Sequence, residues 1–283
     1  MFKQVTIMGP GLLGASLVLA IKKKFLAEKI VVWARSEKTA ENALKKLPVL
    51  QAEKNPASSV RGSDLVIVCT PVETITSILQ SIVGELKQDC LVTDVGSVKA
   101  EVCRSAKNLF KNNKSFFIGS HPMAGSEKSG MDHANENLFL NRTCIITPEE
   151  NTDSKLINKL TLFWENLGMK SVIMNPNDHD SKLSSLSHMP HLVSSILSHS
   201  LYNEIDAASE LCGQGLRDTV RIAGGSPDLW TGIIEKNHTN ILESLKNFEN
   251  SLKIVRSLIS ENDFNGLKQF LIRGSIFQRN LNK

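Results

Sequence analysis

A glycine-rich turn near the N-terminus constrains the fold of this chain more than any other segment. The run Gly9-Pro10-Gly11-Leu12-Leu13-Gly14 separates an apolar stretch at Gln4–Met8 from an apolar stretch with helical spacing at Leu13–Lys22. A buried strand, a tight turn and a buried helix in this order are typical of the first unit of a doubly wound α/β sheet. We therefore predict a strand, a turn and a helix here, with a sheet built around them.

The same turn predicts a dinucleotide site. Gly9 allows the tight turn, Gly11 lets a pyrophosphate approach the backbone, and Gly14 lets the helix pack against the strand. Free N–H groups at the helix start and the helix dipole attract phosphate. The coenzyme-binding residues expected on this turn are Gly9, Gly11, Leu12, Leu13 and Gly14. The alternative is a glycine-rich turn that binds no ligand.

The apolar segment Val5–Ile21 is not expected to cross a membrane or to act as a secretory signal. Glycines interrupt it, it is short for a membrane span, and its positive charges, Lys22-Lys23-Lys24, follow it instead of preceding it. Hydrophobic residues make up 41% of the 283 residues and charged residues 22%, as in ordinary soluble proteins. We expect a soluble, cytoplasmic protein with no membrane partner.

Short apolar runs alternate with helical patterns through the first half of the chain. The runs are continuous and rich in Val and Ile, as strands buried on both faces are. They lie at Gln4–Met8, Ile30–Trp33, Leu65–Cys69, Leu91–Asp94, Phe116–Ile118, Cys144–Thr147 and Ser171–Met174. Helical patterns between several of them lie at Ser36–Leu47, Glu73–Leu86 and Lys99–Phe110. This rhythm predicts a Rossmann-like α/β fold with a doubly wound, mostly parallel sheet.

The pattern changes near Asn175. Pro176-Asn177-Asp178 indicates a turn and a helix start, and no convincing strand follows. Leucines and isoleucines at helical spacing occupy His191–Ala208, Ile233–Leu258 and Phe264–Phe277. We predict a dinucleotide-binding domain over residues 1–175 and an all-helical C-terminal domain over residues 176–283.

Charge and cysteine content limit the classes of partner. The net charge of +4, with a pI near 8.7, is spread along the chain; it suits small anions better than nucleic acid, which calls for a dense basic face. The five cysteines are odd in number and contain no CxxC pair, which disfavours a disulfide framework or a structural zinc site. We expect no nucleic-acid partner and a reducing, cytoplasmic location.

The end of the second expected strand bears on which dinucleotide binds. NAD sites usually carry an acid there, which accepts a hydrogen bond from the ribose 2′-hydroxyl. Here the strand ends in Ala34-Arg35-Ser36, and Arg35 with Ser36 can bind a 2′-phosphate. We predict NADP in preference to NAD, with Thr70 and Pro71 also at the coenzyme. The alternative is that Arg35 is a solvated turn residue and that Ser36 only caps the next helix. Ser36 could also cap this helix while it binds a 2′-phosphate.

Two polar segments follow expected strands, namely Asp94–Lys99 and Gly119–Gly130. Loops at the carboxyl ends of parallel strands converge on the ligand crevice, so Ser97 and His121 are expected there together. An imidazole held by a serine hydroxyl can accept a proton near neutral pH. The sequence thus predicts His121 as a general base oriented by Ser97.

The expected helical domain adds a second polar cluster. Ser187–His191 places two imidazoles at a helix start, and Gly213–Ala223 contains two arginines, of which one is expected to hold a substrate carboxylate. These arginines are Arg217 and Arg221, and the one that does not hold the substrate is expected to pair with Asp218. Because the histidines have no HExxH pattern or carboxylate companion at ligand spacing, no metal is predicted.

These motifs, in this order, resemble the prephenate/arogenate dehydrogenase family of tyrosine biosynthesis. The resemblance covers nearly the whole chain, and its most specific runs are His-Pro-Met-Ala-Gly-Ser-Glu-Lys-Ser-Gly from His121 and Leu-Arg-Asp-Thr-Val-Arg from Leu216. It implies a Rossmann-like domain followed by a helical dimerisation domain.

The resemblance also implies roles for individual residues. His121 matches the base that accepts the proton of the ring 4-hydroxyl, and Ser97 matches the serine that orients it. Arg221 matches the arginine that binds the ring carboxylate. Ser126 and Glu127 match a polar pair at the mouth of the pocket. His191 matches the residue that contacts the substrate side chain, and Trp230 lies near the same pocket.

The implied reaction is NAD(P)-dependent oxidative decarboxylation of prephenate to 4-hydroxyphenylpyruvate. The stretch Leu138–Thr143 has no acid to meet an ammonium group and offers Asn141, which favours prephenate over arogenate, whereas NADP use favours arogenate. An arogenate dehydrogenase and a dual-substrate cyclohexadienyl dehydrogenase therefore remain alternatives. Another NADP-linked dehydrogenase, acting on a hydroxy acid or imine, and a non-catalytic dinucleotide-sensing module are more remote ones.

The apolar faces of Ile233–Leu258 and Phe264–Phe277 exceed what one helical layer can bury against itself. We expect a homodimer through the helical domain. We also expect no regulatory domain after it, so that tyrosine would inhibit only by competing at the active site.

Overall fold

The computed structural model describes residues 1–125 and 128–281, without the side chains of 207–209. Contacts divide the chain into two compact units, Met1–Asn237 and a second unit that begins at His238. The predicted boundary near residue 175 therefore does not coincide with this division, because the helices up to Asn237 pack in the first unit.

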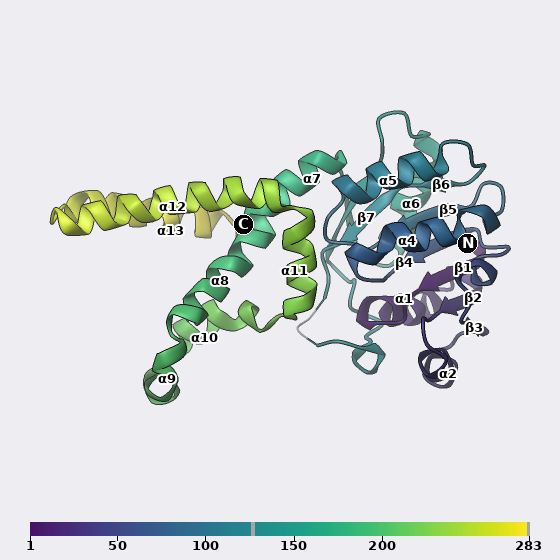
Figure 1. The fold of residues 1–283 in the computed structure, drawn as a ribbon, viewed down its shortest axis with the longest axis horizontal. Coiled ribbons are helices and arrows are strands. Elements are labelled where there is room, and N and C mark those ends of the chain that lie inside the picture. The colour runs from purple at the N-terminus through teal and green to yellow at the C-terminus, as the bar shows by residue number, and fades with distance from the viewer. Residues whose placement is uncertain (126–127, 282–283) are drawn as a thin grey trace. The chain divides into compact units, whose positions relative to one another are not determined.

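A six-stranded parallel sheet forms the centre of the first unit (Figure 1). Its spatial order is β3-β2-β1-β4-β5-β6. The strands are β1 (Phe2–Met8), β2 (Ala27–Trp33), β3 (Gln51–Glu53), β4 (Leu65–Val68), β5 (Leu91–Asp94) and β6 (Phe116–Phe117). The order reverses between β1 and β4, and ligands of such sheets bind at the carboxyl ends of the strands at this point. The glycine turn follows β1 and therefore lies at this position.

Helices cover both faces of this sheet, as the continuous apolar strands predict. Alternate residues of β4 enter different cores: Leu65 and Ile67 join the core that contains α1 (Leu12–Lys23) and α6 (Ser154–Asn166). Val66 and Val68 join the core of the opposite face. That second core contains α4 (Val72–Ile82) and α5 (Ala100–Phe110). A strand that is apolar at every position is stable only when both faces are covered in this way.

A second sheet of three strands follows. β7 (Gly119–Pro122) pairs antiparallel with β8 (Thr143–Thr147), which pairs parallel with β9 (Lys170–Ile173). The single sheet expected from the sequence is thus two sheets, and two of the strands, β3 and β7, were not predicted. The residues of β7 are Gly-Ser-His-Pro and those of β3 are Gln-Ala-Glu, so neither strand has an apolar run to mark it.

The remainder of the first unit is helical, as expected. Asn175 caps α7 (Pro176–Leu183) by accepting from the Asp178 N–H at 2.8 Å, with Pro176 in the first turn. A π-helical turn, η3 (Ser184–His188), leads into α8 (Met189–Ser200). The elements that follow are η4 (Tyr202–Glu204), α9 (Ile205–Leu211), α10 (Gln214–Val220), η5 (Arg221–Gly224) and α11 (Pro227–Lys236). The shorter elements of the sheet region are α2 (Glu37–Lys46), α3 (Pro56–Ser59), η1 (Val83–Glu85) and η2 (Met131–His133).

The second unit is a pair of helices in contact, α12 (His238–Ser260) and α13 (Phe264–Leu281). The turn between them contains Asn262 in the left-handed region, with φ of 57°, and Asp263, which accepts from the Gly266 N–H at 2.8 Å. The helix expected over Ile233–Leu258 is two helices, since α11 ends at Lys236. Among the helices described, none has the length and apolar character needed to cross a bilayer.

Candidate active site

The glycine turn has the geometry that a dinucleotide requires. Gly9 has a φ of +101°, and a Cβ added at Gly14 would lie 2.1 Å from the Gly9 carbonyl oxygen, so both positions need glycine. A Cβ at Gly11 would meet nothing within 4 Å, which leaves room for a phosphate group. Gly11 is also the N-cap of α1 and makes no side-chain cap. The first N–H groups of this helix are thus open to an anion.

A cavity of about 380 Å³ begins at this turn. Its lining includes three segments that follow β1, β4 and β5, namely Gly11–Leu13, Cys69–Val72 and Val95–Ser97. Residues 124–125 and 128–130 also line it, as do Leu229 and Ile233 of α11. The Thr70 hydroxyl is buried and has no partner among the described residues. A buried orphan hydroxyl at the end of β4 is a group that a bound molecule can satisfy. The predicted residues Leu12, Thr70, Pro71 and Ser97 therefore share one cavity.

At the end of β2 the chain carries no acid in the expected position. Ala34 is buried, whereas Arg35 and Ser36 are exposed. The Ser36 hydroxyl accepts from the Thr39 N–H at 3.2 Å and caps α2, as the sequence indicated. The Arg35 side chain makes no ion pair within the described part of the chain, so its guanidinium is available to an anion.

A buried ion pair lies under the ends of β5 and β7. The Lys99 ammonium donates to Asp94 and, at 3.0 Å, to the Ser120 carbonyl oxygen. Asp94 also accepts from the N–H groups of Gly96 and Ser120, at 2.9 and 3.2 Å. Both charged side chains have no exposed area. Since a buried charge is tolerated only when it is paired and hydrogen-bonded, this network fixes the β5 end against β7.

His121 lies on β7, directly after Ser120, and is buried. Its Nδ1 is 2.9 Å from Nε2 of His179, the fourth residue of α7. Nδ1 of His179 is 2.7 Å from Oδ1 of Asp180. Three side chains from β7 and α7 thus form a buried chain of hydrogen bonds. The sequence did not single out His179 or Asp180, because their roles depend on where α7 packs.

Burial holds the pKa of His121 well below its usual range, and repulsion from His179, Lys99 and His188 lowers it further. Burial also lowers the pKa of His179, an effect that its hydrogen bond to Asp180 opposes. Both imidazoles are therefore neutral near pH 7 and can accept protons.

The expected hydrogen bond between Ser97 and His121 is not formed in the described residues. Ser97 follows β5 and lines the cavity, while the Nδ1 of His121 bonds to His179. Ser97 follows β5, and β5 contacts β7, the strand of His121. The hydrogen-bond partner found at His121 Nδ1 is His179.

The helical part of the first unit brings together other predicted residues. The rings of His191 and Trp230 are stacked, with centroids 3.6 Å apart and planes 9° from parallel. His188 meets the same indole edge-on at 6.3 Å. Nε2 of His188 and Nδ1 of His191 are buried without a hydrogen-bond partner in the described residues. His188 also lowers the pKa of His121. The rings of His188, His191 and Trp230 therefore extend the group of buried rings from His121 to α11, the helix of Trp230.

The two predicted arginines are exposed. Arg217 lies on α10 and Arg221 begins η5, which contacts α8, the helix of His191. Neither forms an ion pair within residues 1–125 and 128–281. The predicted pairing of one of them with Asp218 is wrong, because Asp218 accepts from Gln214 at 2.8 Å, one helical turn earlier. Neither arginine lines the cavity, at least among its described residues.

The predicted pair Ser126 and Glu127 lies outside the described residues. Within the described part of the chain, no group of three His, Cys, Asp or Glu side chains could hold a metal.

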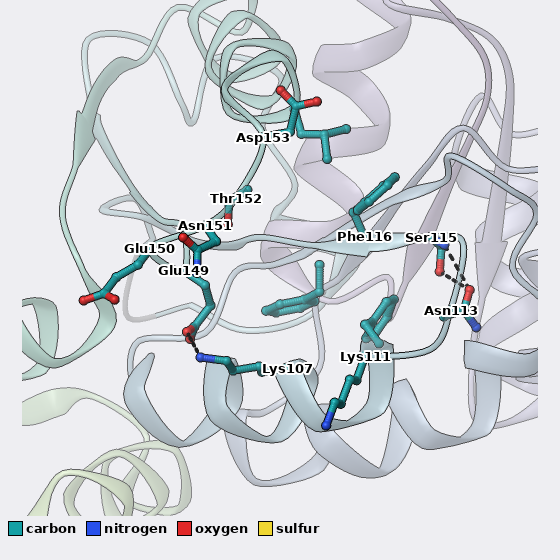
Figure 2. Close-up of a pocket in the computed structure, with 13 residues that line it drawn as sticks. Lys107, Lys111, Asn113, Ser115, Phe116, Glu149, Glu150, Asn151, Thr152 and Asp153 are labelled. Atoms are coloured by element: carbon teal, nitrogen blue, oxygen red, sulfur yellow. Dashed lines mark hydrogen bonds and ion pairs between the residues drawn. The ribbon is translucent and has the colours of Figure 1, made fainter.

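A separate hollow of about 530 Å³ lies between α5 and the segment that precedes α6 (Figure 2). Among its charged residues, Lys107 pairs with Glu149 at 2.9 Å. It contains none of the residues of the glycine turn or the histidine chain. This hollow therefore does not compete with the cavity at Gly11 as the reaction site.

Comparison with known families agrees with this arrangement. Residues 17–173 match the model of the prephenate dehydrogenase nucleotide-binding domain, and residues 175–273 match that of the prephenate dehydrogenase dimerization domain. Among curated proteins, prephenate dehydrogenase of Lactococcus lactis is 32% identical over 276 residues, covering 96% of this chain and 75% of that protein. Cyclohexadienyl dehydrogenase of Zymomonas mobilis is 28% identical, covering 93% of this chain and 90% of the relative.

Solved structures extend the likeness over the whole chain. Prephenate dehydrogenase of A. aeolicus, in complex with hydroxyphenyl propionate and NAD+, has a TM-score of 0.91 at 28% identity and covers 99% of each chain. Synechocystis arogenate dehydrogenase has a TM-score of 0.84 at 30% identity, covering 99% of this chain and 100% of its own. The glycine turn, the buried histidine on β7 and both family models lead to one conclusion: this chain belongs to the prephenate dehydrogenase family.

Proposed function

We propose that this protein catalyses the oxidative decarboxylation of prephenate to 4-hydroxyphenylpyruvate with a nicotinamide dinucleotide. The observation that carries the proposal is the position of His121, which is buried and neutral on β7. Strand β7 contacts β5, and the residues that follow β5 line the cavity that begins at the glycine turn. A bound nicotinamide dinucleotide would take the hydride from the substrate ring. The residues that would hold it are those of the glycine turn, Thr70 and the β2 end.

In this reaction His121 accepts the proton of the substrate's ring hydroxyl. Its low pKa keeps it unprotonated at neutral pH, as a base must be. Ser97, which lines the cavity, is proposed to contact the same hydroxyl. Arg221 is proposed to bind the ring carboxylate through its free guanidinium, with Arg217 as the alternative, and His191 with Trp230 to contact the substrate side chain.

We propose NADP as the preferred coenzyme. This proposal is supported by the lack of an acid at Ala34 and by the exposed Arg35 and Ser36 that follow it. A hydrogen bond to a charged group contributes about 1.5–3 kcal/mol, so Arg35→Ala should raise the KM for NADP about tenfold or more and leave the KM for NAD unchanged. An equal effect on both coenzymes would contradict a 2′-phosphate contact.

The second candidate function is oxidation of arogenate, alone or together with prephenate. It is favoured by the likeness to Synechocystis arogenate dehydrogenase and to the cyclohexadienyl enzyme. Initial rates of coenzyme reduction with prephenate, with arogenate and with neither separate the candidates. No reduction with either substrate would leave a dehydrogenase for another hydroxy acid or imine, or a non-catalytic dinucleotide-binding role.

We also propose that the protein is a homodimer through its C-terminal helices. Many large apolar side chains of α12 and α13 are exposed in the single chain, among them Leu242, Leu252, Phe264, Leu271, Phe277 and Leu281. Apolar patches of this kind mark interaction surfaces in soluble proteins. Light scattering at micromolar concentration should give twice the 31.2 kDa chain mass, and a monomer would contradict the proposal.

A further inference from the structure

The proposed reaction requires a lone pair on the ring nitrogen of His121 that faces the substrate. An imidazole has two nitrogens, and only one of them carries a proton when the ring is neutral. Nδ1 of His121 is already in contact with His179. The group that determines the tautomer of His121 is therefore His179.

We propose that His179, held by Asp180, is a positioning residue that keeps the proton of His121 on Nδ1 and leaves Nε2 free to accept the substrate proton. This inference rests on the proposed dehydrogenase function and adds a residue that the sequence did not indicate.

Asp180 anchors this chain of hydrogen bonds. Its oxygens accept from three N–H groups: Nδ1 of His179 at 2.7 Å, the Lys99 backbone at 2.8 Å and the Ala100 backbone at 2.9 Å. The two backbone donors lie at the start of α5, where the helix dipole favours a carboxylate. An ionised carboxylate only accepts, so the proton between Asp180 and His179 is on His179 Nδ1.

The tautomer of His121 follows from that of His179. When Nδ1 of neutral His179 carries the proton, its Nε2 has a lone pair and can only accept. Nδ1 of His121, 2.9 Å away, must then donate, and Nε2 of His121 is left with the lone pair. Solvent has little access to these protons, because His179 has no exposed area and His121 and Asp180 are almost fully buried. Burial therefore preserves this pair of tautomers.

The same chain can stabilise the charge that forms during the reaction. The substrate O–H bond breaks, an N–H bond forms at Nε2 of His121, and the ring gains one positive charge. The Nδ1 proton of His121 can then move along the hydrogen bond to Nε2 of His179, whose other ring nitrogen, Nδ1, is bonded to the Asp180 anion. Lys99 and His188 also act on His121 and repel this charge, and the Lys99 ammonium is itself paired with Asp94. Asp180 is thus the carboxylate that directly supports the protonated pair.

The position of the relay depends on α7. Asn175 and Pro176 fix the start of this helix, and α7 contacts α5, so the carboxylate reaches the α5 N-terminus from the same turn that holds His179. Asn237 donates to the Asp180 carbonyl oxygen at 2.8 Å and thus braces this turn.

The test that needs no variant is a nitrogen NMR measurement. Protein labelled with 15N at its seven histidines reports which ring nitrogen of each is protonated, and His121 is identified as the signal lost in His121→Gln. We expect the Nδ1–H tautomer for His121 in the wild-type enzyme at neutral pH. An Nε2–H tautomer would overturn the proposal whether or not the enzyme oxidises prephenate.

Two variants extend the test to turnover. His179→Leu removes the acceptor and should lower kcat about 10–100-fold, part of the ~10²–10⁴-fold that a general base supplies, with the KM for coenzyme unchanged. His179→Gln places an amide oxygen near the position of Nε2 and keeps a donor to Asp180, so it should recover most of kcat and the Nδ1–H tautomer. A merely structural role for His179 would give no such recovery at equal thermal stability.

The matched control is His199→Gln, at an exposed histidine of α8, which should leave both kcat and the tautomer unchanged. A kcat within twofold of wild type in His179→Leu would overturn the proposal. If the wild-type protein turned over neither prephenate nor arogenate, the proposed function would fail, and the NMR result would still decide whether His179 fixes the tautomer.

Discussion

The buried groups around the proposed base and the arginines proposed to bind the substrate carboxylate are held in opposite ways. His121, His179, Asp94 and Lys99 are buried, and each has hydrogen-bond partners within the protein. Arg217 and Arg221 are exposed and have no ion-pair partner in the described residues. The difference indicates that the acid–base groups are fixed before any ligand binds, whereas the cationic groups keep their hydrogen-bonding capacity for an anion.

The largest effect is expected at the buried base. His121→Ala should lower kcat by about 10²–10⁴-fold, because proton transfer to a positioned base contributes that much, while coenzyme affinity stays nearly unchanged. Steady-state kinetics and coenzyme titration measure the two quantities. If kcat were unaltered, the base would have to be another group.

The next largest effect is expected on protein stability, at the buried ion pair of Asp94 and Lys99. Lys99→Met leaves the Asp94 carboxylate buried without its cation and should lower the free energy of unfolding by about 3–5 kcal/mol, measured by urea denaturation. Lys107→Met is the matched control, since its pair with Glu149 is on the surface and should leave the unfolding midpoint nearly unchanged. Equal losses in the two variants would show that burial of the ion pair is not what matters.

The buried histidines should also make stability depend on pH. Burial lowers the pKa of His188 to about 4, whereas an unfolded histidine titrates near 6.5. The unfolded chain therefore takes up protons first as the pH falls, so the free energy of unfolding is highest above pH ~6.5 and drops by about 3 kcal/mol towards pH ~4. The lowered pKa values of His121 and His179 act in the same direction.

Thermal unfolding at several pH values measures this dependence. His188→Gln should flatten it, whereas His199→Gln, at an exposed position, should not. A profile of equal slope in both variants would mean that burial of His188 contributes nothing to the acid sensitivity.

The smallest effect is expected on the exposed side. Arg221→Ala should raise the KM for substrate by about 10–100-fold with little change in kcat, since a hydrogen bond to a charged group contributes about 1.5–3 kcal/mol. Arg217→Ala is its control and should have a much weaker effect. The reverse result would move the carboxylate site from η5 to α10.

Much of the fold could be predicted because its signals are local. The strand β4 is apolar at every position, and β1 and β5 contain the apolar pairs Ile7-Met8 and Leu91-Val92. The glycine turn lies between β1 and α1, where backbone geometry requires glycine at Gly9 and Gly14. β7 escaped prediction since Gly-Ser-His-Pro has no apolar pattern, and its burial comes from β8. The expected long helix from Ile233 was two helices because Asn237, whose side chain bonds to Asp180 and His188, ends α11.

Only part of the candidate site could be predicted, because only some of its signals are local in the sequence. Ser97 and His121 were expected together at the ligand crevice. In the structure Ser97 lines the cavity after β5 and His121 lies on β7, which contacts β5, while the hydrogen-bond partner found at His121 is His179. His179 is 58 residues from His121 in the sequence, and no spacing rule relates them.

The sequence by itself determined the Rossmann-like sheet, the dinucleotide turn and the identity of the polar residues near it, because periodicity and glycine placement act over a few neighbouring residues. Only the tertiary structure decided which polar groups bond to one another. The packing of α7 against α5 brings Asp180 to the α5 N-terminus and His179 to His121. Hydrogen bonds of 3 Å or less between distant segments depend on such packing, which local sequence does not encode.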